Sequence, residues 1–185
     1  MQHYKESKGQ SNENKINDFA TPASAWKAIK SFLPKDKICY EPFFLDGGSG
    51  RILKEMGINV IHNNVDFYEY GEKYEYDYIL TNPPFQNCKK LFSHLAKLDK
   101  PFILLLPTLK LHTNYVRDTF GSKLQIIVPR KRIHYHKYLD GKPVENWYKG
   151  TPFDSVYYCY KMNLPRDIIF LGTMICNLEP NVSLT

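Results

Sequence analysis

Hydrophobic positions along the chain fall into short runs that are separated by segments of helical period. Five apolar or alternating runs predict strands: residues 38–44 (ICYEPFF), 59–65 (NVIHNNV), 76–82 (YDYILTN), 101–107 (PFILLLP) and 124–129 (LQIIVP). Four segments predict helices: residues 23–33 (ASAWKAIKSFL), 51–57 (RILKEMG), 86–98 (QNCKKLFSHLAKL) and 109–120 (LKLHTNYVRDTF). Strands that alternate with helices predict an α/β fold with a parallel sheet.

The pattern is different at the start of the chain. Residues 1–17 are polar and predict a disordered tail, which leaves residues 18–185 as a single domain. Thr21 and Pro22 are typical of a helix N-cap and a first helical position, so they predict where the first helix begins.

After the fifth strand the apolar period disappears. Residues 129–154 mix basic and aromatic side chains and contain an Asp-Gly turn, which predicts a hairpin or a long loop for target recognition. The run at 155–162 (SVYYCYKM) predicts a further strand, and the apolar run at 168–175 (IIFLGTMI) is compatible with an edge strand.

Composition indicates which partners and which cellular location the chain is suited to. The 185 residues are 43% hydrophobic, carry a net charge of +6 and include 14 tyrosines, so a nucleic-acid partner is compatible with the chain. No apolar run is long enough to span a bilayer, and the polar start does not resemble a signal peptide. The four cysteines lie far apart, and we expect neither disulfides nor a metal site. We therefore expect a cytoplasmic protein with no membrane partner, as a monomer or a weak dimer.

The sequence TNPPF at residues 81–85 ends the strand at 76–82. Two consecutive prolines cannot donate to a sheet ladder, so the strand must stop at Asn82 in a rigid corner. The corner has two interpretations. It is a turn that only ends the strand, or it is a ligand-binding site, because its amide, its carbonyls and its ring can contact a ligand. A second special turn, EPFFLDGGSG at 41–50, follows the strand at 38–44 and opens a helix, where ligands of open α/β sheets bind.

The two turns together resemble those of adenine-N6 DNA methyltransferases that use S-adenosylmethionine, especially the small phage, viral and bacterial orphan enzymes. The resemblance covers about residues 18–162, and NPPF is its most specific motif. It implies a Rossmann-like class I methyltransferase sheet with helices on both faces, shortened between the first and fourth strands because few residues separate the two turns.

The resemblance also implies roles for individual residues. The expected catalytic residues are Asn82, Pro83, Pro84 and Phe85. The Asn82 side-chain oxygen and the Pro83 carbonyl would accept hydrogen bonds from the adenine amine, and Phe85 would stack on a base flipped out of the duplex. The residues expected to bind S-adenosylmethionine are Phe19, Thr21, Pro22, Glu41, Pro42, Phe43, Asp46, Gly47, Gly48, Gly50, Asn64, Asp66 and Phe67. Those expected to bind nucleic acid are Arg130, Lys131, Arg132, His134, Tyr135, Lys137 and Trp147.

The chain departs from the family pattern at two positions. Leu45 stands where a glycine is expected, and Asn64 stands where a carboxylate is expected to hold the ribose of the cofactor. Glu41 and Asp46 are both candidates for contact with the methionine end of the cofactor, and either could instead cap the following helix. DNA is the favoured substrate. The alternatives are methylation of an RNA base or a protein glutamine, and a non-catalytic nucleic-acid-binding protein that retains the fold.

Overall fold

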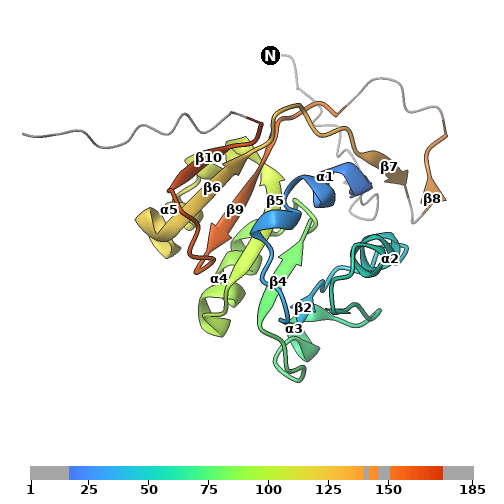
Figure 1. The fold of residues 1–185 in the computed structure, drawn as a ribbon, viewed down its shortest axis with the longest axis horizontal. Coiled ribbons are helices and arrows are strands. Elements are labelled where there is room, and N and C mark those ends of the chain that lie inside the picture. Colours follow the sequence, from blue (N-terminus) through green and yellow to red (C-terminus); the bar gives the residue numbers. More distant parts are fainter. Residues whose placement is uncertain (1–16, 140–141, 146–150, 173–185) are drawn as a thin grey trace, which may run out of the picture.

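The structure is a computed structural model. Its central element is a seven-stranded sheet (Figure 1). The structure describes residues 17–139, 142–145 and 151–172. Within these residues the strands lie in the order β10–β6–β9–β5–β4–β2–β3. Their bounds are β2 Cys39–Tyr40, β3 Val60–Ile61, β4 Tyr78–Thr81, β5 Phe102–Pro107, β6 Leu124–Val128, β9 Ser155–Tyr160 and β10 Ile168–Phe170. All neighbours are parallel except β9, which is antiparallel to both β5 and β6.

The middle of the sheet is buried on both faces, as its apolar sequence requires. Every residue of β4, β5 and β9 is buried, which is typical of strands covered by helices on both sides. The pairing Ile79↔Phe102 and Leu104↔Tyr158 places these four side chains on one face. The residues between them in sequence point to the opposite face.

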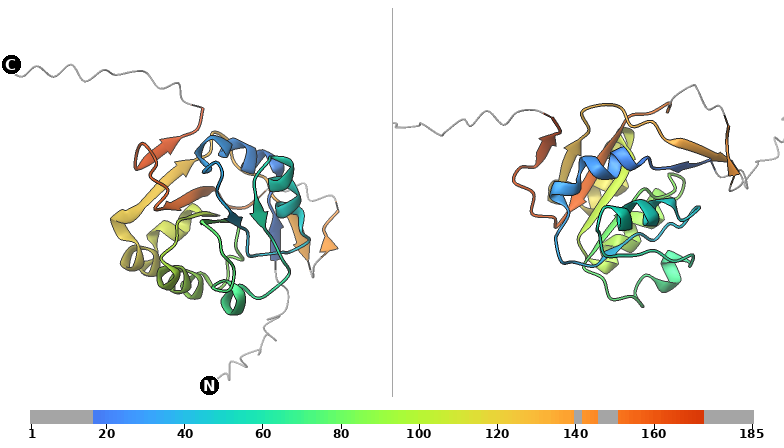
Figure 2. Two further views of the ribbon diagram at one scale, coloured as in Figure 1. Left: turned by 60° about the horizontal axis from the view of Figure 1, so that its bottom comes forward. Right: turned by 45° about the vertical axis from the view of Figure 1, so that its right-hand side comes forward.

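Helices cover both faces of the sheet (Figure 2). The helices are α1 Ala23–Ala28, α2 Gly48–Glu55, α3 Phe67–Tyr70, α4 Cys88–Leu98 and α5 Asn114–Thr119, with 3-10 turns η1 Lys30–Phe32, η2 Thr108–His112 and η3 Gly121–Lys123. Trp26 of α1 and Leu53 of α2 pack into the core on one face. Phe67, Phe92 and Val116, from α3, α4 and α5, pack into the core on the other. The expected class, an α/β Rossmann-like sheet with helices on both faces, is confirmed.

The order of the strands reverses at β2. From β2 the chain passes through α2 to β3 on one side, and then returns through α3 to β4 on the other side. The connection from β3 to β4 contains only the four-residue α3, which confirms the expected shortening between the two turns. Ligands of open α/β sheets bind where the strand order reverses, outside the carboxyl ends of the strands.

A second, three-stranded antiparallel sheet lies beside the central one. It consists of β1 Asn17–Ala20, β7 His136–Leu139 and β8 Lys142–Pro143, in the order β1–β7–β8. β7 and β8 form a hairpin inside the basic-aromatic segment 129–154, and β1 was not predicted as a strand. The predicted tail lies outside the described residues, apart from Asn17.

Several predicted helix boundaries are wrong. The helix predicted at 23–33 is divided into α1 and η1, and the helix predicted at 51–57 is α2, Gly48–Glu55. The first helix begins at Ala23 with Pro22 at the N-cap, because Pro22 has an extended backbone; the hydroxyl of Thr21 does not cap it. The helix predicted at 109–120 is divided into η2 and α5, because Thr113 between them is also extended.

Candidate active site

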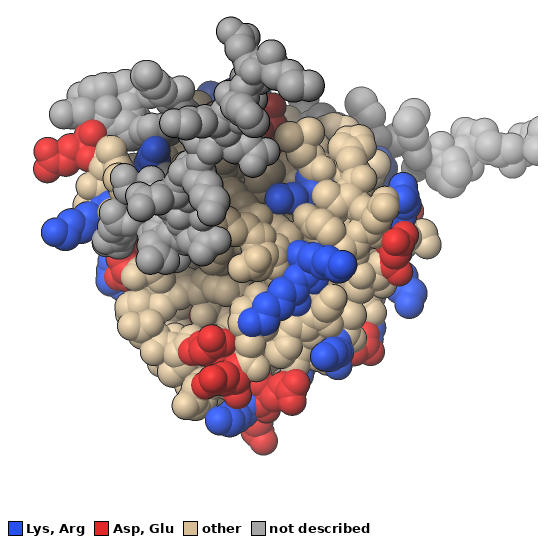
Figure 3. All heavy atoms as spheres, turned by 180° about the vertical axis from the view of Figure 1, so that it is seen from behind, with Lys and Arg blue, Asp and Glu red and all other residues tan. Residues whose placement is uncertain are grey.

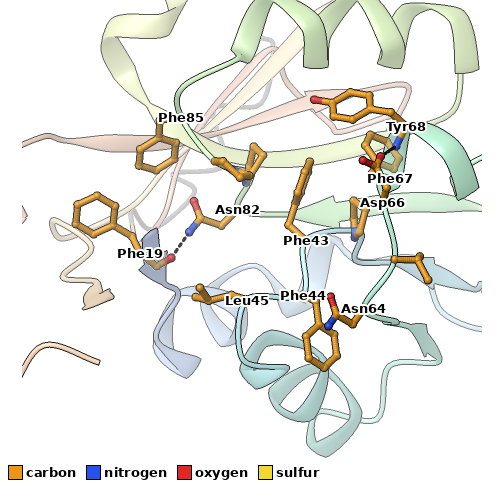
Figure 4. A pocket seen from close by; sticks show the side chains of 14 residues that line it. Phe19, Phe43, Phe44, Leu45, Asn64, Asp66, Phe67, Tyr68, Asn82 and Phe85 are labelled. Atoms are coloured by element: carbon orange, nitrogen blue, oxygen red, sulfur yellow. Dashed lines mark hydrogen bonds between the residues drawn. The ribbon is translucent and has the colours of Figure 1, made fainter. Parts of the chain in front are cut away.

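A pocket of about 260 Å³ lies outside the carboxyl ends of β2, β3 and β4 (Figure 4). Four segments supply its lining: one residue of β1 and the segments that follow the three strands, including the first two residues of α3. The lining residues are Phe19, Pro42, Phe43, Phe44, Leu45, Asn64, Val65, Asp66, Phe67, Tyr68, Asn82, Pro83, Pro84 and Phe85. The fold therefore brings the Pro-Pro corner after β4 together with the segments after β2 and β3.

The amide of Asn82 has a fixed orientation. Its Nδ2 donates a hydrogen bond to the backbone carbonyl of Phe19 at 2.7 Å. Since a carbonyl oxygen only accepts, the amide nitrogen must be the atom that faces Phe19. The other amide atom, Oδ1, is buried and has no hydrogen-bond partner among the described residues. Figure 4 shows Nδ2 turned toward Phe19 and Oδ1 turned away from it. A buried acceptor without a donor is costly, so we expect a water molecule or a ligand donor to satisfy it.

The end of the corner is held from the neighbouring 3-10 turn η2. The Nζ of Lys110 donates to the carbonyl of Phe85 at 3.2 Å, and the thiol of Cys88 donates to the same oxygen at 3.3 Å. Pro83 is buried and Pro84 is exposed. The corner is therefore rigid at both ends, at Asn82 and at Phe85.

The ring of Phe85 belongs to an aromatic cluster. It is nearly parallel to Phe19, with ring centroids 6.0 Å apart and an interplanar angle of 21°. Phe153 packs edge-on against both rings, at 5.4 Å from Phe19 and 5.2 Å from Phe85. A base inserted between the two rings needs about 3.5 Å on each side, and the planes can be no farther apart than the 6.0 Å between the centroids, so the rings would have to separate by at least about 1 Å.

Glu41 lies behind the pocket and does not line it. It is 1% exposed, its Oε1 accepts a hydrogen bond from the Thr81 hydroxyl at 2.5 Å, and its Oε2 lies 2.7 Å from Nδ1 of His62. These three residues follow or end β2, β4 and β3, so the carboxylate joins the ends of three strands. Two roles were expected for Glu41, contact with the cofactor and a helix cap, and its position matches neither. The carboxylate instead braces the ends of the three strands beneath the pocket.

Glu41 and His62 each have a shifted pKa. Burial raises the pKa of Glu41, and the hydrogen bonds from His62 and Thr81 offset part of that effect. Burial alone would lower the pKa of His62, but the hydrogen bond and the charge of Glu41 outweigh it and raise this pKa. The pair therefore retains protons more strongly in the folded state than in the unfolded chain.

The glycine turn is organised by contacts within the protein. Oδ1 of Asp46 accepts from the backbone N–H of Gly48 at 2.8 Å, and Oδ2 accepts from the Tyr138 hydroxyl at 2.8 Å. Burial works to raise the pKa of Asp46, but these hydrogen bonds and the nearby Arg51 lower it. A Cβ on Gly50 would lie 2.3 Å from the ring of His62, so this glycine permits α2 to pack closely on β3. Neither Asp46 nor Gly47, Gly48 and Gly50 line the pocket.

Leu45, where the family pattern has a glycine, has a left-handed backbone. Its φ is 47°, a conformation that L-residues other than glycine seldom adopt and that costs about 1–2 kcal/mol. Its side chain lines the pocket and is 37% exposed. Leu45 thus has a backbone conformation that glycine adopts more readily.

Asn64 and Asp66 line the pocket from the segment after β3. Asn64 is exposed. Oδ1 of Asp66 accepts from the backbone N–H of Tyr68 at 2.6 Å and caps α3. This cap accounts for one carboxylate oxygen of Asp66, and contact of the other with a cofactor stays a prediction. Thr21 and Pro22, also expected to bind the cofactor, do not line the pocket.

The predicted nucleic-acid-binding residues are in different environments. Arg130, Lys131 and His134 are exposed. Arg132 donates to both carboxylate oxygens of Asp154, at 2.7 and 3.0 Å. Tyr135 is 3% exposed and its hydroxyl donates to Ser155, so this ring is a core residue that is not available to stack on a base. Lys137 lies in β7, and Trp147 lies outside the described residues.

The surface charge has no single dominant patch on the face seen from behind. Lysine and arginine are spread over its middle, and acidic side chains gather at its lower edge (Figure 3). The described residues hold no group of three or more His, Cys, Asp or Glu side chains placed to bind a metal ion. Within the same residues, no helix is long and apolar enough to cross a membrane.

The sequence analysis missed several residues that form the site. Phe44, Val65 and Tyr68 line the pocket beside predicted neighbours, and their adjacency to the two motifs was the available signal. His62 and Thr81 gave no signal, because their contact with Glu41 depends on strand order rather than on spacing in the sequence.

Comparison with known proteins gives a limited result. No family model matches the chain, and no curated protein matches it. Two solved structures are similar in fold: a SAM-dependent O-methyltransferase from Thermotoga maritima (12% identity, TM-score 0.39) and TrmN from Thermus thermophilus (16% identity, TM-score 0.35). The matches cover 74% and 75% of this chain, but only 64% and 47% of those proteins. Similarity at this level carries no conclusion about what this chain binds or catalyses.

Proposed function

We propose that the protein transfers a methyl group from S-adenosylmethionine to the exocyclic N6 amine of adenine in DNA. The observation that carries this proposal is the fixed amide of Asn82, whose Oδ1 is a buried acceptor without a partner among the described residues. The pocket lies where open α/β sheets bind ligands, and the family resemblance assigns this corner to the target amine.

The residues around the pocket fit the proposed cofactor in part. Phe43, Asp66 and Phe67 line it together with the Pro-Pro corner, as the resemblance implies. Asn64 can hydrogen-bond a ribose hydroxyl, although without the charge that strengthens such bonds. When bound, S-adenosylmethionine would supply an electrophilic methyl group on a positively charged sulfur.

The corner would activate the target amine through orientation. The lone pair of the adenine amine is delocalised into the ring, which makes the nitrogen a poor nucleophile. Oδ1 of Asn82 and the carbonyl of Pro83 would accept its two N–H groups and favour a pyramidal nitrogen with its lone pair directed at the methyl carbon. When bound, the cofactor would supply the methyl group, with its sulfur as the leaving group that keeps the electrons of the C–S bond. The amine would lose its proton to solvent after the transfer, so no strong base is needed first.

The segment around β7 is proposed to contact the nucleic acid. β7 pairs with β1, whose Phe19 lines the pocket, so part of the basic-aromatic segment lies next to the site. Cations on that segment would neutralise phosphates. Arg130 and Lys131 carry this role best, because Arg132 is already paired with Asp154.

A labelling experiment tests the proposal. The protein is incubated with methyl-labelled S-adenosylmethionine and, in parallel, DNA, RNA and protein substrates, and the products are analysed as nucleosides and amino acids. We expect N6-methyladenine from DNA, and far less of it from DNA treated with a folded Asn82→Ala variant. Label in RNA bases or in glutamine would replace the substrate and keep the chemistry. Nucleic-acid binding without transfer to any substrate would establish the non-catalytic alternative.

A further inference from the structure

A hydrogen bond between two distant parts of the chain fixes the side chain of Asn82. Its Nδ2 donates to the carbonyl of Phe19, which lies 63 positions earlier in the sequence. Asn82 follows β4 of the central sheet, whereas Phe19 belongs to β1 of the small sheet. We infer that the Phe19 carbonyl is a positioning group, which holds the Asn82 amide so that Oδ1 remains free to accept from a ligand. The kinetic part of this inference rests on the proposed function, and the stability part does not.

The contact selects one of two amide orientations. Rotation of the amide by half a turn would place Oδ1 against the Phe19 carbonyl, so that two acceptor oxygens would face each other at about the distance of the present hydrogen bond. The present orientation avoids this repulsion and commits one of the two N–H groups of Nδ2 to the Phe19 carbonyl. The pocket is therefore offered an acceptor at this point (Figure 4).

The small sheet and the aromatic cluster hold the Phe19 carbonyl in place. β1 pairs with β7 along four residues, from Asn17↔Leu139 to Ala20↔His136. β7 is tied to the main domain by the Tyr138 hydroxyl, which donates to Asp46 at 2.8 Å. The ring of Phe19 packs on Phe85 and Phe153. The carbonyl that orients Asn82 is thus fixed both by pairing and by packing.

The substitution Asn82→Asp would place a carboxyl group against this carbonyl, and its two protonation states would meet the carbonyl differently. The ionised carboxylate has only acceptors, so one of its oxygens would face the Phe19 carbonyl without a proton between them. The protonated acid can donate its O–H to that carbonyl and keep its other oxygen as an acceptor, as the asparagine does. The protonated form of the new side chain is therefore the form that reproduces the native arrangement.

Other charged groups near the corner act on both forms of the protein. Glu41 is buried behind Thr81, and Asp66 lies across the pocket; both disfavour a second negative charge. Lys110, bonded to the Phe85 carbonyl, favours it. All three are present in the wild type as well, so a ratio of variant to wild type at each pH removes their own effects and leaves those of the new carboxyl, including its interactions with them.

The experiment compares Asn82→Asp with wild type and with Asn87→Asp from pH 5 to pH 8.5. Asn87 is a matched control, because it is exposed at the N-cap of α4 five residues later in the same loop. We expect the turnover of Asn82→Asp relative to wild type to rise by about tenfold for each unit of pH decrease above the pKa of the new carboxyl, and then to level off. The ratio for Asn87→Asp should stay flat.

Thermal unfolding gives a second readout that needs no substrate. The inference expects a folded-state pKa for the carboxyl of Asn82→Asp above the unfolded value of about 3.9, so its destabilising effect appears as pH rises past that value and grows up to the folded pKa. The melting temperature of Asn82→Asp relative to wild type should accordingly fall as pH rises. At an N-cap, ionisation is favourable, so Asn87→Asp should show no change or the opposite sign.

The two readouts separate the inference from the proposed function. If wild type transfers methyl groups and Asn82→Asp matches it at every pH, with the same melting temperature, the positioning role of Phe19 is wrong. If wild type transfers no methyl group to any substrate, the proposed function fails, and the melting temperatures alone decide the inference. A pH-dependent loss of stability that is confined to Asn82→Asp supports it in either case.

Discussion

The Pro-Pro corner and the glycine turn follow neighbouring strands, but they differ in whether their polar side chains find hydrogen-bond partners within the protein. In the glycine turn, both oxygens of Asp46 accept hydrogen bonds from the protein, and Gly50 makes room for the ring of His62. In the corner, Oδ1 of Asn82 is buried without a partner among the described residues. The carboxylate of Asp46 is thus satisfied within the protein, whereas the amide oxygen of Asn82 is left for a water molecule or a ligand donor.

The largest effect should come from removing that acceptor. We expect Asn82→Ala to lower the turnover of the proposed reaction by about a hundredfold or more, because alanine cannot accept a hydrogen bond from the reacting amine. Unfolding free energy should fall by only about 1 kcal/mol, the usual value of one neutral hydrogen bond. Single-turnover kinetics and urea unfolding measure the two quantities, with Asn87→Ala as the control. A folded Asn82→Ala protein that turns over at the wild-type rate would reduce the corner to a structural turn.

The brace beneath both turns should affect stability more than ligand binding. We expect Glu41→Gln to lower the unfolding free energy by about 1.5–3 kcal/mol, the usual value of a hydrogen bond to a charged group. The shape of the pH dependence is the sharper test. Because the pKa of Glu41 and that of His62 are both raised in the folded state, folded wild type binds protons more strongly than the unfolded chain, so its stability falls as pH rises.

Glu41→Gln removes one titrating group and the cause of the other shift, so it should flatten this dependence. Urea unfolding at pH 5, 6, 7 and 8 measures it, with Glu55→Gln at the exposed end of α2 as a control of the same chemistry. Equal slopes for wild type and Glu41→Gln between pH 5 and 8 would contradict the coupling of these two residues.

Much of the fold was predictable because the information is local. Alternating and apolar runs identified all the strands of the central sheet, including the edge strand β10, and the few residues between the turns predicted the short connection that contains only α3. The corner was predictable because proline restricts its own backbone and that of the preceding residue.

What could not be predicted depends on contacts between distant segments. Strand β1 is formed by pairing with β7, more than a hundred residues later, and nothing in NDFA alone indicates it. The same holds for the Phe19 carbonyl that orients Asn82 and for the partners of Glu41. The burial of individual side chains could not be predicted either. Tyr135 lies between exposed neighbours in the sequence, but its ring is buried and packs against Phe153.

A substitution at Asn64, in the segment after β3, tests whether the pocket binds the cofactor. Asn64 lines the pocket where the family pattern has a carboxylate. We expect Asn64→Asp to bind S-adenosylmethionine about three to tenfold more tightly, because a charge-assisted hydrogen bond to a ribose hydroxyl is roughly twice as strong as a neutral one. Titration calorimetry measures the affinity, and Asn63→Asp, one position earlier, is the control. Weaker binding by Asn64→Asp would place the ribose elsewhere.

The smallest effect concerns the exposed cations beyond the pocket. Removing one cation that neutralises a phosphate should reduce the slope of log affinity against log salt by roughly one unit, so we expect Arg130→Ala and Lys131→Ala to flatten the salt dependence of DNA binding by about that amount each. Arg132→Ala is the matched control, since its guanidinium already pairs with Asp154 and its removal leaves a carboxylate behind. Arg132→Ala should weaken DNA binding, because the negative charge of Asp154 is then unpaired. Asp154→Asn, which removes that charge and leaves Arg132 in place, should therefore strengthen DNA binding. Filter binding on duplexes of unrelated sequence, from about 50 to about 200 mM salt, measures all four slopes. If Arg130→Ala and Lys131→Ala keep the wild-type slope, these side chains form an ordinary solvated surface, and the nucleic acid must be held from another part of the chain.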